Sequence, residues 1–230
     1  MIKFIFKWLL RLFILAVVVV VIFLLSLDSI LRVVMENRIR AQTGMDAEIG
    51  KFTLGLVEPT ITIKDFKLFN PPSFGGTPFL DIPEIHIEYD RTALAKHQIH
   101  VTLLRLNLGE LDIVKNEAGQ TNLFSIAALP SVKKPGGGGG KTFAKETGFE
   151  FTGIDVLNVS VGTAKYIDLK DSKNNREQKI GIENCVIKNV KTPTDLAGLA
   201  ALVALRCGDF FGSLVGQKSS GMDVLNLIGR

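Results

Sequence analysis

The chain has 230 residues, of which 47% are hydrophobic and 22% are charged, and its formal net charge is +4. Residues 1–43 carry six basic and two acidic side chains, whereas the remaining residues carry 21 of each, so the basic excess surrounds the amino-terminal apolar segment. This distribution excludes a basic face for nucleic acid and is typical of one membrane segment joined to a modest globular domain.

The first element is an apolar segment, WLLRLFILAVVVVVIFLLSL, at residues 8–27. A helix of this length reaches about 30 Å, the thickness of a hydrocarbon core. A cleaved signal peptide has a shorter apolar region that ends in a small-residue cleavage site, which Asp28 to Arg32 do not provide. We therefore predict a tail at 1–7 and a retained transmembrane helix at 8–27. Basic residues before the span place the tail in the cytoplasm and the remainder outside, although three arginines also follow the span.

A second helix is predicted over residues 28–43, directly after the span. Its apolar residues recur at near-helical spacing among charges: Ile30, Val33, Val34 and Ile39. Gly44 follows as a favourable carboxy-terminal cap. The apolar stripe lies either on the membrane or against the following domain, and we favour docking on the domain.

Period-two alternation dominates the chain after Gly44 and predicts about eight strands, each with an apolar and a polar face. The segments are 49–57, 60–69, 79–89, 98–108, 110–115, 148–161, 163–170 and 180–190. Three of them change phase midway, after Ile63, Leu103 and Phe151. A phase change implies a bulge that bends the strand, and repeated bends curl the apolar face inward. The fold class is therefore mainly β with flanking helices, built on a curved, bulged, antiparallel sheet.

Two further patterns concern the organisation of these strands. LRLNLGELDIVKN at 104–116 resembles LNVSVGTAKYIDLKD at 157–171, a weak repeat that fits stacked hairpins of one design. Between the repeats, KKPGGGGGKTF ends like a phosphate-binding loop, but Pro135 stands where the first glycine belongs and no apolar strand precedes it. We predict a flexible linker at 133–141 and no nucleotide site. It separates a first β module, 44–132, from a second, 142–193.

The carboxy-terminal segment, 194–230, is predicted to be helical. Thr194 is a candidate cap, and one helix face carries apolar residues: Leu196, Leu199, Leu202 and Val203. The uncharged stretch is too short to span a bilayer, which predicts a buried or interfacial helix. Two cysteines, Cys185 and Cys207, lack metal-site spacing; they either pair in an oxidising compartment or act as small apolar residues on a strand and a helix.

Candidate catalytic and metal-binding patterns are weak. His97 and His100 stand three apart, but at the start of a strand they would face opposite sides. His86 lies between Glu84 and Glu88, a set that is more often a solvated polar face than a metal site. No serine has a nucleophile-elbow context and no carboxylate pair is distinguished. We therefore predict no catalytic residue, no metal ligand and no cofactor.

Residues 43–90, TGMDAEIGKFTLGLVEPTITIKDFKLFNPPSFGGTPFLDIPEIHIEYD, resemble the opening of the AsmA family of bacterial envelope proteins. The resemblance rests on Thr43-Gly44 and on the turn from Asn70 to Phe74 with Pro78. A second element, GELDIVKNEAGQTNLFSI at 109–126, is similar to the family's "G-x-x-N-L" element through Gly119, Asn122 and Leu123. These are turn and packing residues, and the similarity is close over 1–130 and loose over 142–230.

The resemblance implies a taco-like sheet with an apolar groove, related to bridge-type lipid transfer proteins, and a role in envelope lipid homeostasis from the inner membrane. Eight strands at about 4.8 Å each stack to only about 40 Å, too short to bridge a periplasm. The expected partners are phospholipid or another acyl-chain lipid, the inner membrane, and envelope proteins or a second copy of the chain. Candidate groove residues come from one face of the strands: Ile61, Ile63, Ile85, Ile87, Ile99 and Val101.

Three alternatives remain open at this stage. The six candidates either line an open groove or belong to a closed core covered by the carboxy-terminal helix. The domain either binds lipid or serves as an envelope scaffold that recruits partners through sheet edges or the terminal helix. A membrane-anchored LEA-like β-sandwich is a third possibility, which the Thr-Gly and G-x-x-N-L elements disfavour.

Overall fold

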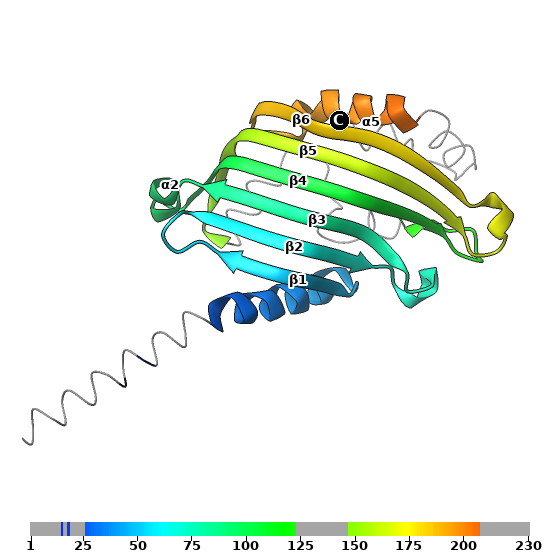
Figure 1. The fold of residues 1–230 in the computed structure, drawn as a ribbon, viewed down its shortest axis with the longest axis horizontal. Helices are drawn as coiled ribbons and strands as arrows, with labels where there is room; N and C mark the ends of the chain where they lie inside the picture. The colour runs from blue at the N-terminus through cyan, green and yellow to red at the C-terminus, as the bar shows by residue number, and fades with distance from the viewer. Residues whose placement is uncertain (1–14, 16–17, 19–25, 123–146, 208–230) are drawn as a thin grey trace, which may run out of the picture.

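The structure, a computed structural model, describes residues 15, 18, 26–122 and 147–207, and within them the protein is mainly β (Figure 1). Six strands form one sheet in sequence order. They are β1 (Ala47–Leu54), β2 (Thr60–Phe69), β3 (Pro78–Tyr89), β4 (Gln98–Lys115), β5 (Glu150–Asp168) and β6 (Arg176–Val190). The short helical elements are η1 (Pro72–Phe74), α2 (Arg91–Ala95), η2 (Ser172–Asn174) and η3 (Pro193–Leu196), which leads into α5 (Ala197–Cys207).

The sheet is mixed, which corrects the prediction of an antiparallel sheet. β4 and β5 pair in parallel, while every other neighbouring pair is antiparallel. Alternation along one strand carries no information about the direction of its neighbour, whereas a parallel pair requires a crossover connection. Residues 116–149 supply that connection, and the predicted linker 133–141 lies in the part of it outside the described residues. Strands from both predicted β modules belong to this single sheet.

The sheet has fewer and longer strands than predicted, because two glycines that suggested strand ends lie within strands. Gly109 is inside β4 and Gly162 is inside β5. They meet at a close approach, since a Cβ atom on Gly162 would overlap with the Gly109 carbonyl oxygen. The weak repeat is aligned by the same pairing, with Leu104 opposite Leu157 and Glu110 opposite Thr163. The two repeats are therefore parallel neighbours in one register, not stacked hairpins.

A transverse crease accounts for the change of phase after Ile63. One residue of each strand contributes to it: Gly50, Asp65, Pro83, Gly109, Gly162 and Gly181. Asp65 and Gly181 have positive φ angles of 53° and 61°. Ile63 pairs with Ile85 before the crease and Phe66 pairs with Ile82 after it, so both strands change phase together. At β2 and β3 the change of phase occurs without the register shift of a bulge, whereas the β5–β6 register does shift between Val161 and Thr163.

The other two predicted phase changes are bulges, as expected. The register between β3 and β4 shifts at Glu88/Tyr89, opposite the change after Leu103. The register between β4 and β5 shifts at Ile99/His100, opposite the change after Phe151. Each bulge adds an unpaired residue and increases the local twist, which contributes to the arched strands in Figure 1.

The helix at residues 26–43 lies along edge strand β1 (Figure 1), so the prediction that it docks on the domain is confirmed. The docking residues, however, are Leu31 and Met35, which pack against the buried cluster of Ile49, Phe52 and Ile63. Three residues of the predicted stripe are exposed: Ile30, Val33 and Val34. The stripe was misassigned because the helix also uses polar side chains to bind the strand edge.

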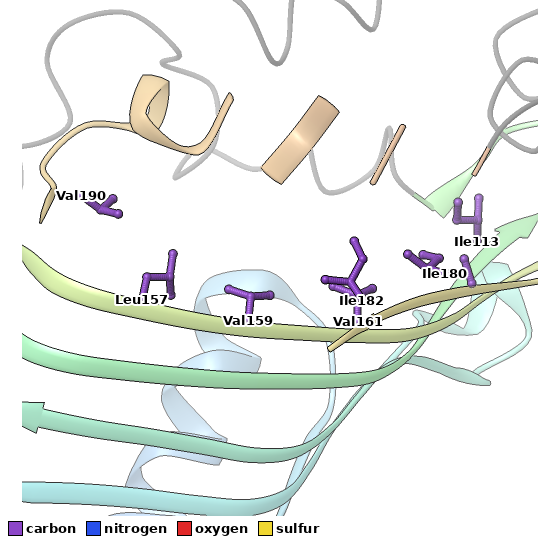
Figure 2. Packing of buried hydrophobic residues seen from close by; sticks show 8 residues of the cluster. Ile113, Leu157, Val159, Val161, Ile180, Ile182 and Val190 are labelled. Carbon is purple, nitrogen blue, oxygen red and sulfur yellow. The ribbon is translucent and has the colours of Figure 1, made fainter. Parts of the chain in front are cut away.

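The second helix, α5, packs on the same face of the sheet near its other edge strand, β6. The predicted apolar residues, Leu196 at the end of η3 and Leu199, Leu202 and Val203 on α5, pack against a cluster on β4, β5 and β6. Figure 2 shows members of this cluster in a row between the strands and α5, with the strands curving toward the helix. The predicted cap is wrong by two residues, because Thr192 caps η3 in a reciprocal arrangement with Asp195.

No helix within the described residues is both long and apolar enough to cross a bilayer. The predicted span, 8–27, falls almost wholly outside those residues, as do 208–230 of the predicted carboxy-terminal segment.

Candidate apolar binding site

An apolar pocket lies on the central strands, between the two helix-covered clusters. Its volume is about 330 Å³, within the range of small-molecule sites. It is lined by Ile61, Ile87, Tyr89, Asp90, Leu94, Gln98, Ile99, His100 and Val101. Because almost all of the accessible lining is apolar, the pocket favours a hydrocarbon chain over a polar ligand.

The structure divides the six groove candidates into two groups. Ile61, Ile87, Ile99 and Val101 line the pocket. Ile63 is buried in the cluster beneath the 26–43 helix, and Ile85 packs against that cluster; Ile61 also packs against it and so contacts both the cluster and the pocket. Ile61 pairs with Ile87 and Ile63 pairs with Ile85, so both groups share one face of the sheet. The crease side of this face is therefore packed core, and the α2 side holds the pocket.

Local backbone features build the pocket wall. Asp90 begins α2 by accepting hydrogen bonds from the backbone N–H groups of Thr92 and Ala93, at 2.7 and 3.2 Å. The N–H groups of Ala93 and Thr92 hold the pKa of Asp90 below its usual value, so the capping carboxylate stays ionised. This cap orients the short helix so that Leu94 reaches the pocket.

The turn between β1 and β2 is attached to a residue that lines the pocket, Tyr89. The Tyr89 N–H donates to the Pro59 carbonyl oxygen at 3.0 Å, which joins this turn to the end of β3. Leu94 lies between the predicted strands and Gln98 is the polar first residue of one, so alternation does not single them out. Tyr89 continues the alternation of Ile85 and Ile87 but was not chosen as a groove candidate. The Asp90 capping pattern was the one available signal for a helix at this position.

The histidines make separate contacts. His97 stacks against Phe149 with ring centroids 5.3 Å apart, while His100 contacts Thr152 Oγ1 and Asp155 Oδ2 at 3.1 Å each. His86 contacts Thr62 Oγ1 at 2.8 Å and Glu88 Oε1 at 3.3 Å. Within residues 26–122 and 147–207, no three His, Cys, Asp or Glu side chains are arranged to hold a metal ion.

The opposite face of the sheet carries cross-strand charge pairs. Lys64 and Lys67 lie 4.0 and 3.8 Å from Glu84 and Asp81, and Lys165 donates to Glu110 at 2.6 Å. This polar pattern does not suit an acyl chain, so the pocket face is the candidate site.

The two elements of the family resemblance meet at the far end of the sheet. The Asn122 side-chain amide donates to Asn70 Oδ1 and to the Asp112 carbonyl oxygen, each at 2.8 Å, and its own oxygen accepts from the Val114 N–H at 3.1 Å. Asn122 and Asn70 are both buried. The network ties the turn after β2 to the chain after β4, a structural role that agrees with the view of these residues as turn and packing residues.

Cys185 lies on β6 and Cys207 ends α5, as the strand-and-helix interpretation predicted. Cys185 has a free thiol and packs against the cluster under α5. Searches with protein-family models, among curated proteins and among solved structures find no match to this chain.

Proposed function

We propose that this chain is a membrane-anchored, non-catalytic envelope protein whose pocket binds an acyl chain of phospholipid or a similar lipid. One observation carries the proposal: four of the groove candidates, Ile61, Ile87, Ile99 and Val101, line an apolar pocket on the sheet face against which the two helices pack. An exposed apolar pocket of this size costs free energy in water, and an acyl chain removes that cost.

The proposal includes the finer features that the AsmA resemblance implies. The sheet acts as a short, taco-like scoop, with residues 8–27 as a single-pass anchor in a bacterial inner membrane. The amino terminus is cytoplasmic, and the bulk of the chain is periplasmic. The six-stranded width makes the chain a local lipid carrier or homeostasis factor beside the membrane, since about 4.8 Å per strand cannot reach a second membrane.

The test is lipid retention by the full chain, purified in detergent and analysed by native mass spectrometry. Ile61→Trp fills the pocket, whereas Lys64→Trp adds the same group to an exposed position on the opposite face of β2. We expect wild type and Lys64→Trp to retain acyl lipid and Ile61→Trp to retain several-fold less, with all three giving the same circular dichroism spectrum. A wild-type chain free of lipid would contradict the proposal.

The scaffold function is a second candidate, favoured by exposed apolar residues near the β6 edge. Leu205 on α5 is 81% exposed, and Val186 on β6 is 52% exposed. A partner or a second copy of the chain that covers them would remove this surface from water. Cysteine crosslinking from Leu205→Cys in a Cys185→Ser, Cys207→Ser background tests it, and a purely monomeric, uncrosslinked chain in membranes would argue against it.

A further inference from the structure

The tip of the β1–β2 hairpin presents two apolar side chains to solvent. Val57 is 89% exposed and Leu56 is 53% exposed, on a tip that contains Gly55 and Pro59. Val and Leu at a turn contribute nothing to the core here, and turns usually carry polar residues. The tip therefore requires an explanation outside the folding of the domain.

The tip is also held in a fixed shape. The Arg91 guanidinium donates to the carbonyl oxygens of Leu56 and Val57 at 2.9 and 3.0 Å, using one nitrogen for both. The Gly55 N–H donates to the Thr60 carbonyl oxygen at 2.8 Å and closes the turn. Arg91 holds the two backbone carbonyl groups, so the side chains of Leu56 and Val57 form an ordered apolar tip that projects into solvent.

The tip lies beside the point where the chain joins its predicted anchor. Asp28 is the first residue after the predicted span 8–27, and its Oδ1 accepts from the Leu54 N–H at 3.0 Å. Val57 is three residues beyond Leu54, a reach of at most about 10 Å. A span that ends at Leu27 therefore places Leu56 and Val57 close to the headgroup region.

We infer that Leu56 and Val57 insert into the interfacial region of a phospholipid bilayer, as a second membrane contact beside the anchor. The inference rests on the proposed function, because it takes residues 8–27 as a transmembrane helix. On the outer side of the 26–43 helix, exposed Ile30, Val33 and Val34 extend the same apolar contact. Two contacts fix the tilt of the domain, which a single flexible anchor does not.

This contact would orient the pocket toward lipid. Pro59, at the base of the tip, accepts a hydrogen bond from the Tyr89 N–H. Tyr89 and Leu94 both line the pocket. A tip embedded in headgroups holds this end of the pocket at the bilayer surface, where an acyl chain can enter without crossing water. The tip therefore marks the end of the pocket that faces the membrane in the proposed carrier.

The experiment uses the full chain, which contains one tryptophan, Trp8. In a Trp8→Phe background, Val57→Trp reports on the tip and Ser73→Trp reports on an exposed position in η1, at the other end of the sheet. Each variant is reconstituted into vesicles of phosphatidylcholine and phosphatidylglycerol, with or without bromine on the acyl chains. We expect brominated lipid to quench Val57→Trp several-fold more than Ser73→Trp.

The outcomes separate this inference from the proposed function. Equal, weak quenching at both positions in chains that still retain lipid would overturn the tip contact and leave lipid binding intact. Strong quenching at Val57→Trp in chains that retain no lipid would support the tip contact and overturn the carrier. A blue-shifted but unquenched Val57→Trp would mean that the tip is covered by protein, such as a second copy of the chain, and would overturn the inference.

Discussion

The two helices cover opposite ends of one sheet face by different means. The 26–43 helix uses side chains at four-residue intervals to bind the open edge of β1. Asp28 and Glu36 accept from the N–H groups of Leu54 and Ile49, at 3.0 and 2.8 Å, and Arg32 reaches the Gly50 carbonyl oxygen at 3.5 Å. The segment of η3 and α5 instead packs through four apolar residues, and Gln178 of β6 donates a long hydrogen bond to the Arg206 carbonyl oxygen at 3.4 Å.

The difference indicates what each end of the sheet requires. β1 is an edge strand, and its free backbone groups would otherwise pair with another chain, so side chains that bind them protect the edge. The β5–β6 end has eight buried apolar residues, against three beneath the 26–43 helix, and it depends on burial. We therefore expect the free energy of unfolding to fall most when a cavity is made beneath α5, and to fall at β1 when a hydrogen bond between the helix and the strand edge is removed.

The largest expected effect comes from the core under α5. Ile113→Ala removes a side chain with no exposed surface from the larger cluster and should lower the free energy of unfolding by about 4 kcal/mol. Ile49→Ala, equally buried in the smaller cluster, should cost about 2–3 kcal/mol, because partly exposed neighbours can close the cavity. Urea titration of both variants in the same detergent measures the difference. Equal losses would show that the two clusters are packed alike.

Alternation predicted the strands that carry this core but not how the core divides into two clusters. Alternation located β2 to the residue, and the phase changes located both bulges and the crease, because side-chain period and backbone bends are local properties. The parallel β4–β5 pair depends on contacts far apart in the sequence, which local patterns do not encode. The strand breaks predicted at Gly109 and Gly162 are wrong for the same reason, since the close approach of these two glycines involves neighbouring strands.

For the candidate site, the sequence predicted the face but not the position of the pocket. All six groove candidates share one face, yet only the register and the position of α2 distinguish Ile61, which lines the pocket, from Ile63, which is core. The helix at 26–43 gives a similar lesson. Its docking side was misassigned because Asp28, Arg32 and Glu36 look like solvent-facing charges until their strand partners are known.

The hydrogen bonds at the β1 edge provide the next prediction. Glu36→Ala leaves the Ile49 N–H without its acceptor and should cost about 1–2 kcal/mol of unfolding free energy. Glu36→Gln keeps an acceptor oxygen and should lose less. Gln178→Ala, the matched deletion at the α5 end, should be nearly neutral because that contact is long and exposed. Hydrogen exchange at the Ile49 amide should accelerate in Glu36→Ala alone; unchanged exchange would mean that the helix does not protect the edge.

Asp112, a buried carboxyl group on the polar face of β4, provides a prediction about pH dependence. Burial, together with the nearby Glu110 carboxylate, raises the pKa of Asp112 to about 6 from its ordinary 3.8. A carboxyl group whose pKa is higher in the folded protein binds its proton more tightly there than in the unfolded chain. Protonated Asp112 therefore stabilises the folded state fully below pH 3.8, and this contribution is lost as the pH rises through about 6. Asp112→Asn should therefore gain stability relative to wild type across this window, by about 1–2 kcal/mol at pH 7.5, since one pKa unit corresponds to about 1.4 kcal/mol.

Urea titrations of Asp112→Asn at pH 4, 5, 6 and 7.5 measure this effect. Asp81→Asn, which changes a partly exposed carboxylate on β3, controls for the loss of one negative charge. A difference between Asp112→Asn and wild type that stays constant from pH 4 to 7.5 would contradict the raised pKa.

The smallest effects are expected from the ion pairs, which again differ between the halves. Lys67 and Asp81 are 3.8 Å apart and both partly exposed, so Lys67→Ala should change the free energy of unfolding by at most about 0.5 kcal/mol. Lys115 lies 3.5 Å from Asp168, whose side chain is only 4% exposed. Burial opposes ionisation of Asp168, yet the N–H groups of Lys170 and Asp171 and the Asn174 amide hold its pKa below the usual value, so it stays charged.

Lys115→Ala should therefore cost about 1 kcal/mol, because it leaves a nearly buried carboxylate without its cation. Adding 0.5 M salt should screen the Lys67 pair and leave the Lys115 effect largely intact, since buried pairs are screened less. The comparison is made by urea titration of both variants at low and high salt. Identical losses and identical salt dependence would show that the two ion pairs do not differ in their electrostatics.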